Sequence, residues 1–166
     1  MSTTEISLQD AFKDVMSCVA TPVSIVTALA RDGAPCGATV SAFASLSVSP
    51  AMVMVSLDRR SSTLEVIRES GRFGLNVLGA DQADLALTFA SKQGIGKFGG
   101  ALWSVDHEVP RLAGTSAWIA AGVAGLQDGG DHVVVLGHVE TAESEDAENK
   151  SPLVYYRRRF GTYLSY

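Results

Sequence analysis

Residues 37–50 read GATVSAFASLSVSP, and this run decides how the rest of the chain is interpreted. Hydroxyl side chains occupy its odd positions, at Thr39, Ser41, Ser45, Ser47 and Ser49. Apolar side chains occupy its even positions, at Val40, Ala42, Ala44, Leu46 and Val48, while Phe43 interrupts the hydroxyl series. Alternate side chains of an extended strand point to opposite faces, so the hydroxyls would share one face. Such a face suits close binding of a polar ligand, and a water-exposed edge strand explains the pattern equally well.

The composition is that of an ordinary globular protein, with 46% hydrophobic and 19% charged residues. A chain of 166 residues is long enough to bury a core, and we expect a single domain over residues 1–166. The net charge of −5 and the scattered basic residues argue against nucleic acid and membranes as partners. Two cysteines and the lack of a signal-peptide pattern favour a cytoplasmic location. The uncharged run 33–57 is too rich in Pro, Gly and Ser for a membrane span.

Hydrophobic periodicity predicts a mainly β chain with short helices. Strands are expected at residues 22–30, 51–57, 73–77, 115–125 and 131–141, and the run 37–50 is expected to form the second strand and the loop after it. Amphipathic spacing predicts helices near residues 8–15, at 63–70 and after Asp81. Six strands linked largely by hairpins, with helices between some of them, favour an antiparallel β-barrel with helical insertions.

Two local predictions concern the middle of the chain. Ser62 and Glu65 fit a capping box in which Ser62 is the N-cap of the helix expected at 63–70, and Gly71 fits its terminator. Residues 91–109 carry no clear periodicity, so we expect an irregular segment that leaves Phe98 and Trp103 exposed.

Sequence motifs exclude several kinds of chemistry. Residues 94–99 match the letters of a dinucleotide-binding G-x-G-x-x-G, but a helix is expected before them and none after, so we interpret them as a loop. His107 has no second ligand at metal-binding spacing, and we expect no metal site. There is no serine-nucleophile elbow. His132 lies at a strand entrance, where it either faces a cleft or is an ordinary strand-end histidine, and the pattern alone favours the latter.

An ordered series of segments resembles one known family. The segments are VSIVT at 23–27, DG at 32–33, GATVSAF at 37–43, SP at 49–50, FGLNVL at 73–78, Gln82, FA at 89–90, GDH at 130–132 and PLVYY at 152–156. In order and spacing they are similar to the flavin reductase-like family with the FMN-binding split-barrel fold. The resemblance implies a mainly β fold, a six-stranded antiparallel Greek-key split β-barrel with short helical insertions.

The resemblance also implies a set of site residues. Thr39, Val40 and Ser41 match the segment that lines the isoalloxazine ring, Ser45 matches the turn that follows, and Ser56 ends a strand near the same ring. Arg60, Ser61, Ser62 and Thr63 match a helix start near the flavin phosphate, where free N–H groups and the helix dipole favour an anion. The remaining matches are Phe89 and Phe98 at the pocket border, Tyr155 near the flavin, and His132 near the nicotinamide, as the catalytic residue.

The function implied is an NAD(P)H-dependent flavin reductase that transfers hydride to FMN or FAD and supplies reduced flavin to a partner monooxygenase. NADH and NADPH, like FMN and FAD, remain open. Hydride transfer between two stacked rings needs no protein nucleophile, which fits the absence of a catalytic dyad. We expect a homodimer, because a barrel of this size does not easily enclose a flavin. The alternatives are a non-enzymatic flavin-binding or flavin-sensing protein on the same barrel, and an oxidase acting on another substrate.

Overall fold

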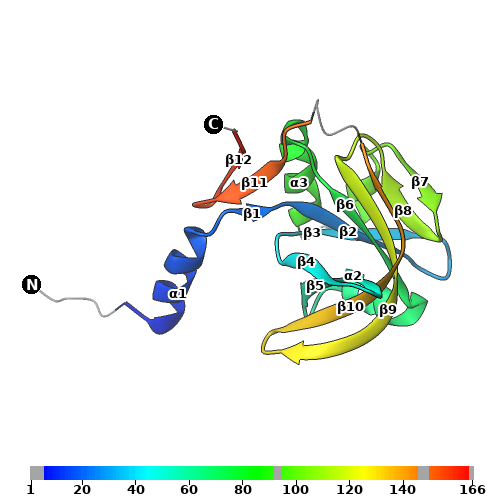
Figure 1. Cartoon of the computed structure of the whole chain (residues 1–166), viewed down its shortest axis with the longest axis horizontal. Coiled ribbons are helices and arrows are strands. Elements are labelled where there is room, and N and C mark those ends of the chain that lie inside the picture. The colour runs from blue at the N-terminus through cyan, green and yellow to red at the C-terminus, as the bar shows by residue number, and fades with distance from the viewer. Residues whose placement is uncertain (1–5, 92–94, 146–149, 165–166) are drawn as a thin grey trace, which may run out of the picture.

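The computed structural model describes residues 6–91, 95–145 and 150–164, and these residues form a mainly β protein, as predicted (Figure 1). Its helices are α1 (Leu8–Ser17), α2 (Ser62–Ser70) and α3 (Ala83–Ala90), with short 3-10 turns η1 (Ala80–Gln82) and η2 (Ile95–Phe98). Its strands are β1 (Thr21–Pro22), β2 (Ser24–Leu29), β3 (Pro35–Val40), β4 (Phe43–Val48), β5 (Ala51–Asp58), β6 (Arg72–Val77), β7 (Trp103–Asp106), β8 (Val109–Leu112), β9 (Ala117–Gly129), β10 (His132–Ser144), β11 (Leu153–Tyr156) and β12 (Arg159–Thr162). No described helix is both long and apolar enough to cross a membrane.

The main sheet is a split barrel. Its strand order is β3-β2-β6-β9-β10-β5-β4, and every neighbouring pair is antiparallel. β3 and β4 follow each other along the chain, yet they form the two opposite edges of this sheet. Because only Ser41 and Ala42 separate them, the sheet must curl until its edges meet at this corner. There Ser56 N donates to Ala42 O at 2.8 Å.

The division of the 37–50 run corrects the expected strand count. The main sheet has seven strands where six were expected, because the run bends at Ser41 and forms two strands. A register shift between Ser45 and Ser47 then breaks the alternation of side chains along β4. The hydroxyl side chains therefore do not share one face along the whole run, and the apolar side chains of β4 are largely open to solvent, with Val48 92% exposed.

The start of α2 also differs from the prediction. Ser61, in extended conformation, is the N-cap, and its side chain accepts no capping hydrogen bond within the described structure. The helix begins one residue early because a turn precedes it, in which Ser61 N donates to Asp58 O at 2.9 Å. The expected capping box at Ser62 and Glu65 is thus not formed. Gly71 does end the helix in the left-handed conformation, with φ of 71°.

Residues 95–109, the part of the segment 91–109 that the structure describes beyond Ser91, are more regular than expected, while residues 92–94 lie outside the described residues. The described part contains η2 and most of the β7–β8 hairpin, whose turn places His107 and Glu108 at φ of 47° and 60°. Phe98 is 7% exposed, not exposed as expected, because its ring packs edge-on against Phe89 and Trp103 at centroid distances of 4.9 and 5.4 Å. Trp103 is half-buried. Aromatic packing on α3 therefore orders a segment that has no periodicity of its own.

The core explains why β8 lies against the main sheet. Asn76 of β6 is fully buried, and its amide donates to Ile25 O at 3.2 Å and accepts from Leu112 N at 2.8 Å. Thr27, also buried, donates to Pro110 O at 2.6 Å. A buried polar group without a partner is costly, so these bonds hold the β7–β8 hairpin in one position.

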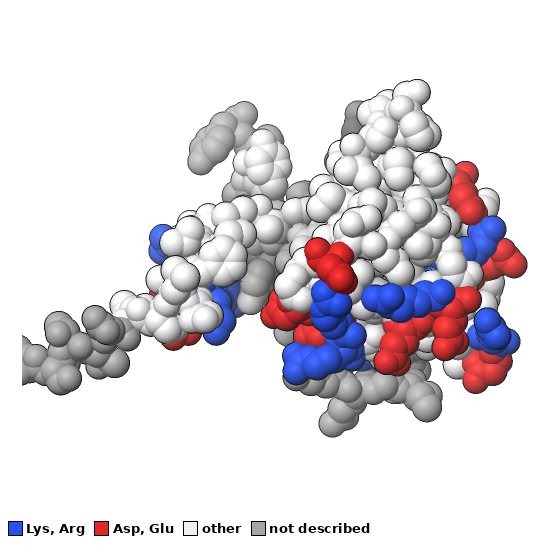
Figure 2. All heavy atoms as spheres, turned by 90° about the horizontal axis from the view of Figure 1, so that it is seen from below, with Lys and Arg blue, Asp and Glu red and all other residues white. Residues whose placement is uncertain are grey.

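Helix α1 stands apart from the sheet body. Figure 1 shows it extending away from the main sheet, next to the small sheet formed by β1, β11 and β12. None of its residues is buried against the described body, and its large apolar side chains are open to solvent. On the face shown in Figure 2, acidic and basic side chains gather mainly in mixed clusters on the sheet body, and fewer lie beside α1.

Candidate functional site

Three connected hollows surround Thr39 at the corner between β3 and α2. The polar chamber, about 460 Å³, is lined by Ala38, Thr39, Asp58, Arg60, Ser61, Ser62, Thr63, Phe89, Ala90, Ser91 and Lys97. The corner chamber, about 280 Å³, is lined by Ala38, Thr39, Val40, Ser41, Ala42, Ser56, Leu57, Asp58, Ser61 and His132. The apolar chamber, about 310 Å³, is lined by Val23, Thr39, Val40, Ser41, Leu87, Ala90, Tyr155, Arg158 and Phe160. Together we call them the Thr39 groove.

The Thr39 groove brings together most of the residues that the sequence singled out. Those that line it are Thr39, Val40, Ser41, Ser56, Arg60, Ser61, Ser62, Thr63, Phe89, Tyr155 and His132. Ser45 and Phe98 do not belong to the described lining. Ser45 lies on β4 beyond the corner, opposite Val53, and Phe98 packs behind Phe89. Residues from β3, β5, α2, α3, β10 and β11 therefore meet at one place, although they are far apart in the sequence.

Helix α3 fixes the position of Thr39. The Thr39 hydroxyl donates to Ala86 O at 2.6 Å, which ties the C-terminal end of β3 to α3. Its only hydrogen is used in this bond, so the oxygen offers the groove an acceptor. The chain then turns at Ser41, and Val40 and Ser41 line both the corner chamber and the apolar chamber.

The positive charge of Arg60 is paired with the Asp58 carboxylate within the polar chamber. Its guanidinium makes two hydrogen bonds to the Asp58 carboxylate, at 3.1 and 2.9 Å, and its backbone N–H makes a third at 2.8 Å. These bonds hold the pKa of Asp58 well below its usual range and raise the pKa of Arg60. The α2 start beside this pair has N–H groups without helical partners, as every helix start does.

Lys97 is a lining residue that the sequence did not reveal. Its ammonium donates to Gly37 O at 3.2 Å and to Phe89 O at 3.0 Å, and within the described structure no carboxylate lies at ion-pair distance from it. Burial lowers its pKa, because desolvation disfavours the charged form. The one available signal was a basic residue in a glycine-rich segment that was interpreted as a loop.

His132 faces the groove, where the sequence pattern alone favoured an ordinary strand-end position. It pairs with Asp58 across β10 and β5, and it lines the corner chamber. Its Nδ1 lies 2.7 Å from the carboxylate of Asp131, which fixes the ring and lowers the pKa of Asp131. The hydrogen bonds of the described residues involve only Nδ1 of this ring, so Nε2 can contact a ligand.

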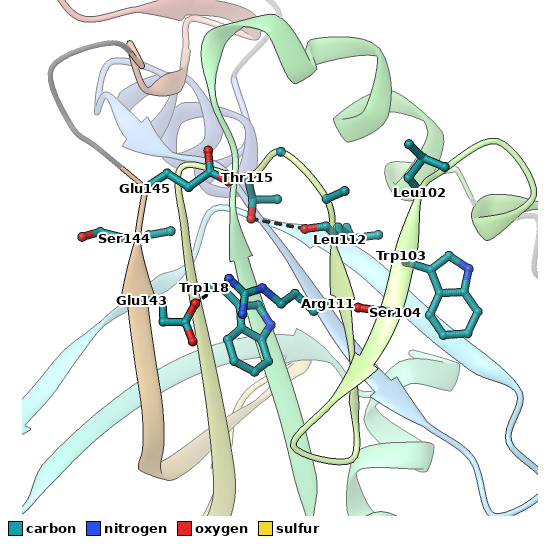
Figure 3. A pocket seen from close by; sticks show the side chains of 13 residues that line it. Leu102, Trp103, Ser104, Arg111, Leu112, Thr115, Trp118, Glu143, Ser144 and Glu145 are labelled. Carbon is teal, nitrogen blue, oxygen red and sulfur yellow. Dashed lines mark hydrogen bonds and ion pairs between the residues drawn. The ribbon is translucent and has the colours of Figure 1, made fainter.

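A separate hollow of about 440 Å³ lies between the β7–β8 hairpin, β9 and the end of β10 (Figure 3). Its described lining shares no residue with the Thr39 groove. Arg111 stacks over the Trp118 ring at 4.7 Å and pairs with Asp106 and Glu143 at 3.0 and 2.6 Å. The Arg111 charge is thus matched by protein carboxylates, and we take the Thr39 groove as the candidate site.

Comparison with known proteins points to one family. A family model described as flavin reductase like domain matches residues 16–163. The reductase component of a 4-nitrophenol 4-monooxygenase/4-nitrocatechol 2-monooxygenase from Rhodococcus opacus is 41% identical over 155 residues, covering 93% of this chain and 81% of that protein.

Solved structures give the same result. Nitrilotriacetate monooxygenase component B from Mycobacterium thermoresistibile superimposes with a TM-score of 0.89 at 31% identity, covering 94% of this chain and 87% of that chain. An NADH:FAD oxidoreductase from Streptomyces globisporus C-1027, solved in complex with NAD and FAD fragments, superimposes with a TM-score of 0.87 at 25% identity, covering 98% of each chain.

Proposed function

Since the chain belongs to the flavin reductase like family, we propose that it is an NAD(P)H-dependent flavin reductase that supplies reduced FMN or FAD to a separate monooxygenase component. The observation that carries this proposal is the Thr39 groove. Residues chosen for their resemblance to flavin-contacting positions come from six elements of the fold and line one continuous set of chambers.

The groove suits the two parts of a flavin. Val40 and Ser41 line both the apolar and the corner chamber, and Tyr155 adds an aromatic ring to the apolar chamber, a lining that suits a planar ring. The polar chamber offers the α2 start and a cation, which suit a phosphate. An uncharged hydroxyl wall binds the ring without a strong ion pair, as release of a reduced flavin requires.

The protein's part in the reaction is to bind and orient. A bound flavin supplies the hydride acceptor and a bound nicotinamide supplies the donor. Thr39, Val40 and Ser41 would hold the flavin ring, and His132, oriented by Asp131, would position the nicotinamide against it. Holding two rings in contact lowers the entropic part of the barrier, and this requires no protein nucleophile.

Anaerobic mixing tests the function directly. The purified protein is combined with FMN or FAD and then with NADH or NADPH, and the flavin absorbance is followed in a stopped-flow instrument. We expect catalysed bleaching with at least one of the four pairs. A protein that binds flavin but leaves it oxidised with both nicotinamides would be a flavin-binding or flavin-sensing protein, and the reductase proposal would fail.

The assembly and location are part of the same proposal. We propose a homodimer, because α1 presents an uncovered apolar face and the Thr39 groove is open. We propose that reduced flavin reaches the oxygenase component by diffusion. A cytoplasmic location agrees with the two cysteines, Cys18 and Cys36, both of which are free thiols.

A further inference from the structure

We propose that Arg59 is a positioning residue for hydride transfer, because it holds the turn that carries His132 beside the corner chamber. The proposal rests on the proposed function, since it concerns how the same groove presents His132 to the nicotinamide. Arg59 stands in the chain between Asp58 and Arg60, which both line the polar chamber, but it does not belong to the described lining of the Thr39 groove. An effect of Arg59 on the reaction would therefore pass through another residue.

Two turns meet beside the corner chamber. The first joins β5 to α2 and is closed by the bond from Ser61 N to Asp58 O at 2.9 Å. The second joins β9 to β10, and its Gly130 lies in the left-handed region with φ of 71°. His132, the first residue of β10, pairs with Asp58, the last residue of β5. The two turns therefore lie side by side at the same end of the β5–β10 pair.

Arg59 connects these two turns through three contacts. Its backbone N–H donates to Asp131 O at 3.0 Å, and its side-chain Nε donates to Gly130 O at 2.7 Å. Its guanidinium also pairs with the Asp128 carboxylate, with 2.8 Å between Nη2 and Oδ1. All three partners belong to the few residues that precede His132 in the chain. One arginine of the first turn therefore holds three positions of the second.

The β9–β10 turn needs such a partner, because its own sequence and packing hold it weakly. Residues 128–131 are exposed, and Gly129 and Gly130 have more backbone freedom than other residues. Local motion concentrates at exposed tips of this kind. The Asp131 carboxylate lies 2.7 Å from Nδ1 of His132, so a movement of the turn also moves the ring. Contacts to reacting groups are sensitive to displacements of about 1 Å.

The adjacent arginine, Arg60, does not provide this link. Its guanidinium makes its two described hydrogen bonds to the Asp58 carboxylate, within the first turn. The Arg59 side chain instead reaches the second turn, where it pairs with Asp128 and bonds Gly130 O. The Arg59 side chain is 41% exposed and that of Arg60 is 84% exposed. The lower exposure of Arg59 agrees with a side chain held between two segments.

Variants on both sides of the ion pair separate position from charge. Arg59→Met removes a positive charge and Asp128→Ala removes a negative one, so a purely electrostatic effect would change the anaerobic rate of flavin reduction in opposite directions. Positioning predicts that both variants lower the rate at saturating nicotinamide, by about ten-fold for Arg59→Met. The loss for Asp128→Ala should be smaller, because the bond to Gly130 O remains. Flavin dissociation constants should change little. Arg68→Met, in the exposed last turn of α2, controls for net charge and should match the wild type.

A double variant and the histidine NMR spectrum show whether Arg59 acts through His132. In the His132→Ala background, Arg59→Met should cause no further loss of rate, because the group that it positions is absent. The chain has three histidines, His107, His132 and His138, so the ring signal of His132 can be assigned by its absence from His132→Ala. We expect Arg59→Met to shift or broaden this signal in the flavin-free protein and to leave the other two unchanged.

Any one of three results would overturn the proposal. They are opposite effects of Arg59→Met and Asp128→Ala on the rate, a further loss of rate in the double variant, and an unchanged His132 signal in Arg59→Met. A wild type that reduces no flavin with either nicotinamide would instead overturn the proposed function. The histidine spectrum requires neither flavin nor nicotinamide, so it still decides whether Arg59 holds His132 in position.

Discussion

His132 is the groove residue whose removal should slow hydride transfer without changing the fold. Its side chain is half-exposed and, among the described residues, is held by Asp131, so His132→Ala leaves no buried cavity. We expect the anaerobic reduction rate to fall about ten- to a hundred-fold, because the nicotinamide loses a positioning contact. Flavin binding should change little.

The control for this variant is His138→Ala. His138 lies on the same strand, is exposed and does not belong to the described lining of the groove. Equal reduction rates for the wild type and His132→Ala would show that the histidine has no part in the reaction.

Protonation of Lys97 should make the affinity for FMN depend on pH. Burial lowers the pKa of Lys97 from the ordinary 10.5. The Cys36 side chain opposes this change when it is ionised, although burial raises the pKa of that thiol. The charged Asp58–Arg60 pair shares the chamber. Only the protonated ammonium attracts phosphate, so the affinity for FMN relative to riboflavin should fall as the pH rises, starting below 10.5. The ratio of the two affinities removes the effect of flavin-ring ionisation, because FMN and riboflavin contain the same ring. A ratio that stays constant up to pH 10.5 in titrations of the wild type would contradict this expectation.

The lowered pKa has a matching effect on stability. The folded protein holds the Lys97 proton less firmly than the unfolded chain, so the buried charge destabilises the fold below the folded-state pKa. This penalty disappears as the pH rises through the folded-state pKa towards the ordinary value. The two effects oppose each other, since the charge that favours FMN costs stability in the empty groove.

At the residue scale, the sequence predicted site residues that lie in short recognisable runs. It did not predict site residues whose position depends on tertiary packing. Thr39 to Ser41 and Ser61 to Thr63 belong to short runs with their own pattern, and both line the groove. Ser45 lies outside because a two-residue corner redirects the strand. Lys97 was missed because only the folded chain brings its carbonyl partners on β3 and α3 together.

At the scale of elements, Gly137 permits β10 to cross the buried ring of Phe73. A Cβ at Gly137 would lie 2.6 Å from Phe73 Cζ and 3.0 Å from Ala121 Cβ. Phe73 is fully buried, so its ring cannot move aside cheaply. We expect Gly137→Ala to lower the free energy of unfolding by about 1–3 kcal/mol, as overpacked cores do.

Gly125→Ala is the matched control, measured in the same urea titration. Gly125 lies on the neighbouring strand β9, and a Cβ there would meet Leu136 Cδ1 at an ordinary 3.8 Å. Because the backbone can accept alanine, we expect a neutral or slightly stabilising effect, up to about 1 kcal/mol. Similar losses of stability in the two variants would mean that contact with Phe73 does not explain the glycine.

The difference between local sequence pattern and tertiary packing also explains which strands were predicted. β2, β5, β6 and β10 have apolar patterns that predicted them within a few residues. The β7–β8 hairpin was missed, because its turn uses His107 and Glu108 in the left-handed region where glycine or asparagine is the usual signal. That hairpin is held by buried bonds to Asn76 and Thr27 rather than by its own pattern.

At the scale of the whole molecule, the split of the barrel and the position of the groove have one cause. The sheet edges β3 and β4 meet at Ser41 and Ala42 without pairing along their length. A closed barrel would fill its interior with side chains at this point. The open corner instead leaves backbone and short hydroxyl side chains accessible, and α2, α3 and the β11–β12 hairpin surround it.

From the exposed apolar face of α1 we expect a homodimer that covers this helix. Leu8, Phe12 and Val15 lie on one side of this helix and are 82, 62 and 65% exposed. Asp14 of α1 pairs with Arg158 at 2.6 Å, and Arg158 lines the apolar chamber, so a partner that covers α1 also stabilises one wall of the groove. A second copy of the chain offers the same apolar face, and pairing two such faces is the commonest form of symmetric assembly.

We therefore expect a dimer by light scattering at micromolar concentration, and a monomer when Leu8 and Phe12 are both changed to glutamine. Two buried apolar side chains contribute about 3–6 kcal/mol, so the dissociation constant should rise at least a hundred-fold. Lys13→Gln, on the polar side of α1, should leave the dimer intact, since its exposed pair with Asp10 at 3.5 Å contributes little. The monomeric variant should also bind flavin more weakly, because the Arg158 wall loses its support. A wild-type monomer, or a dimer that persists in the Leu8 and Phe12 double variant, would show that α1 does not form the interface.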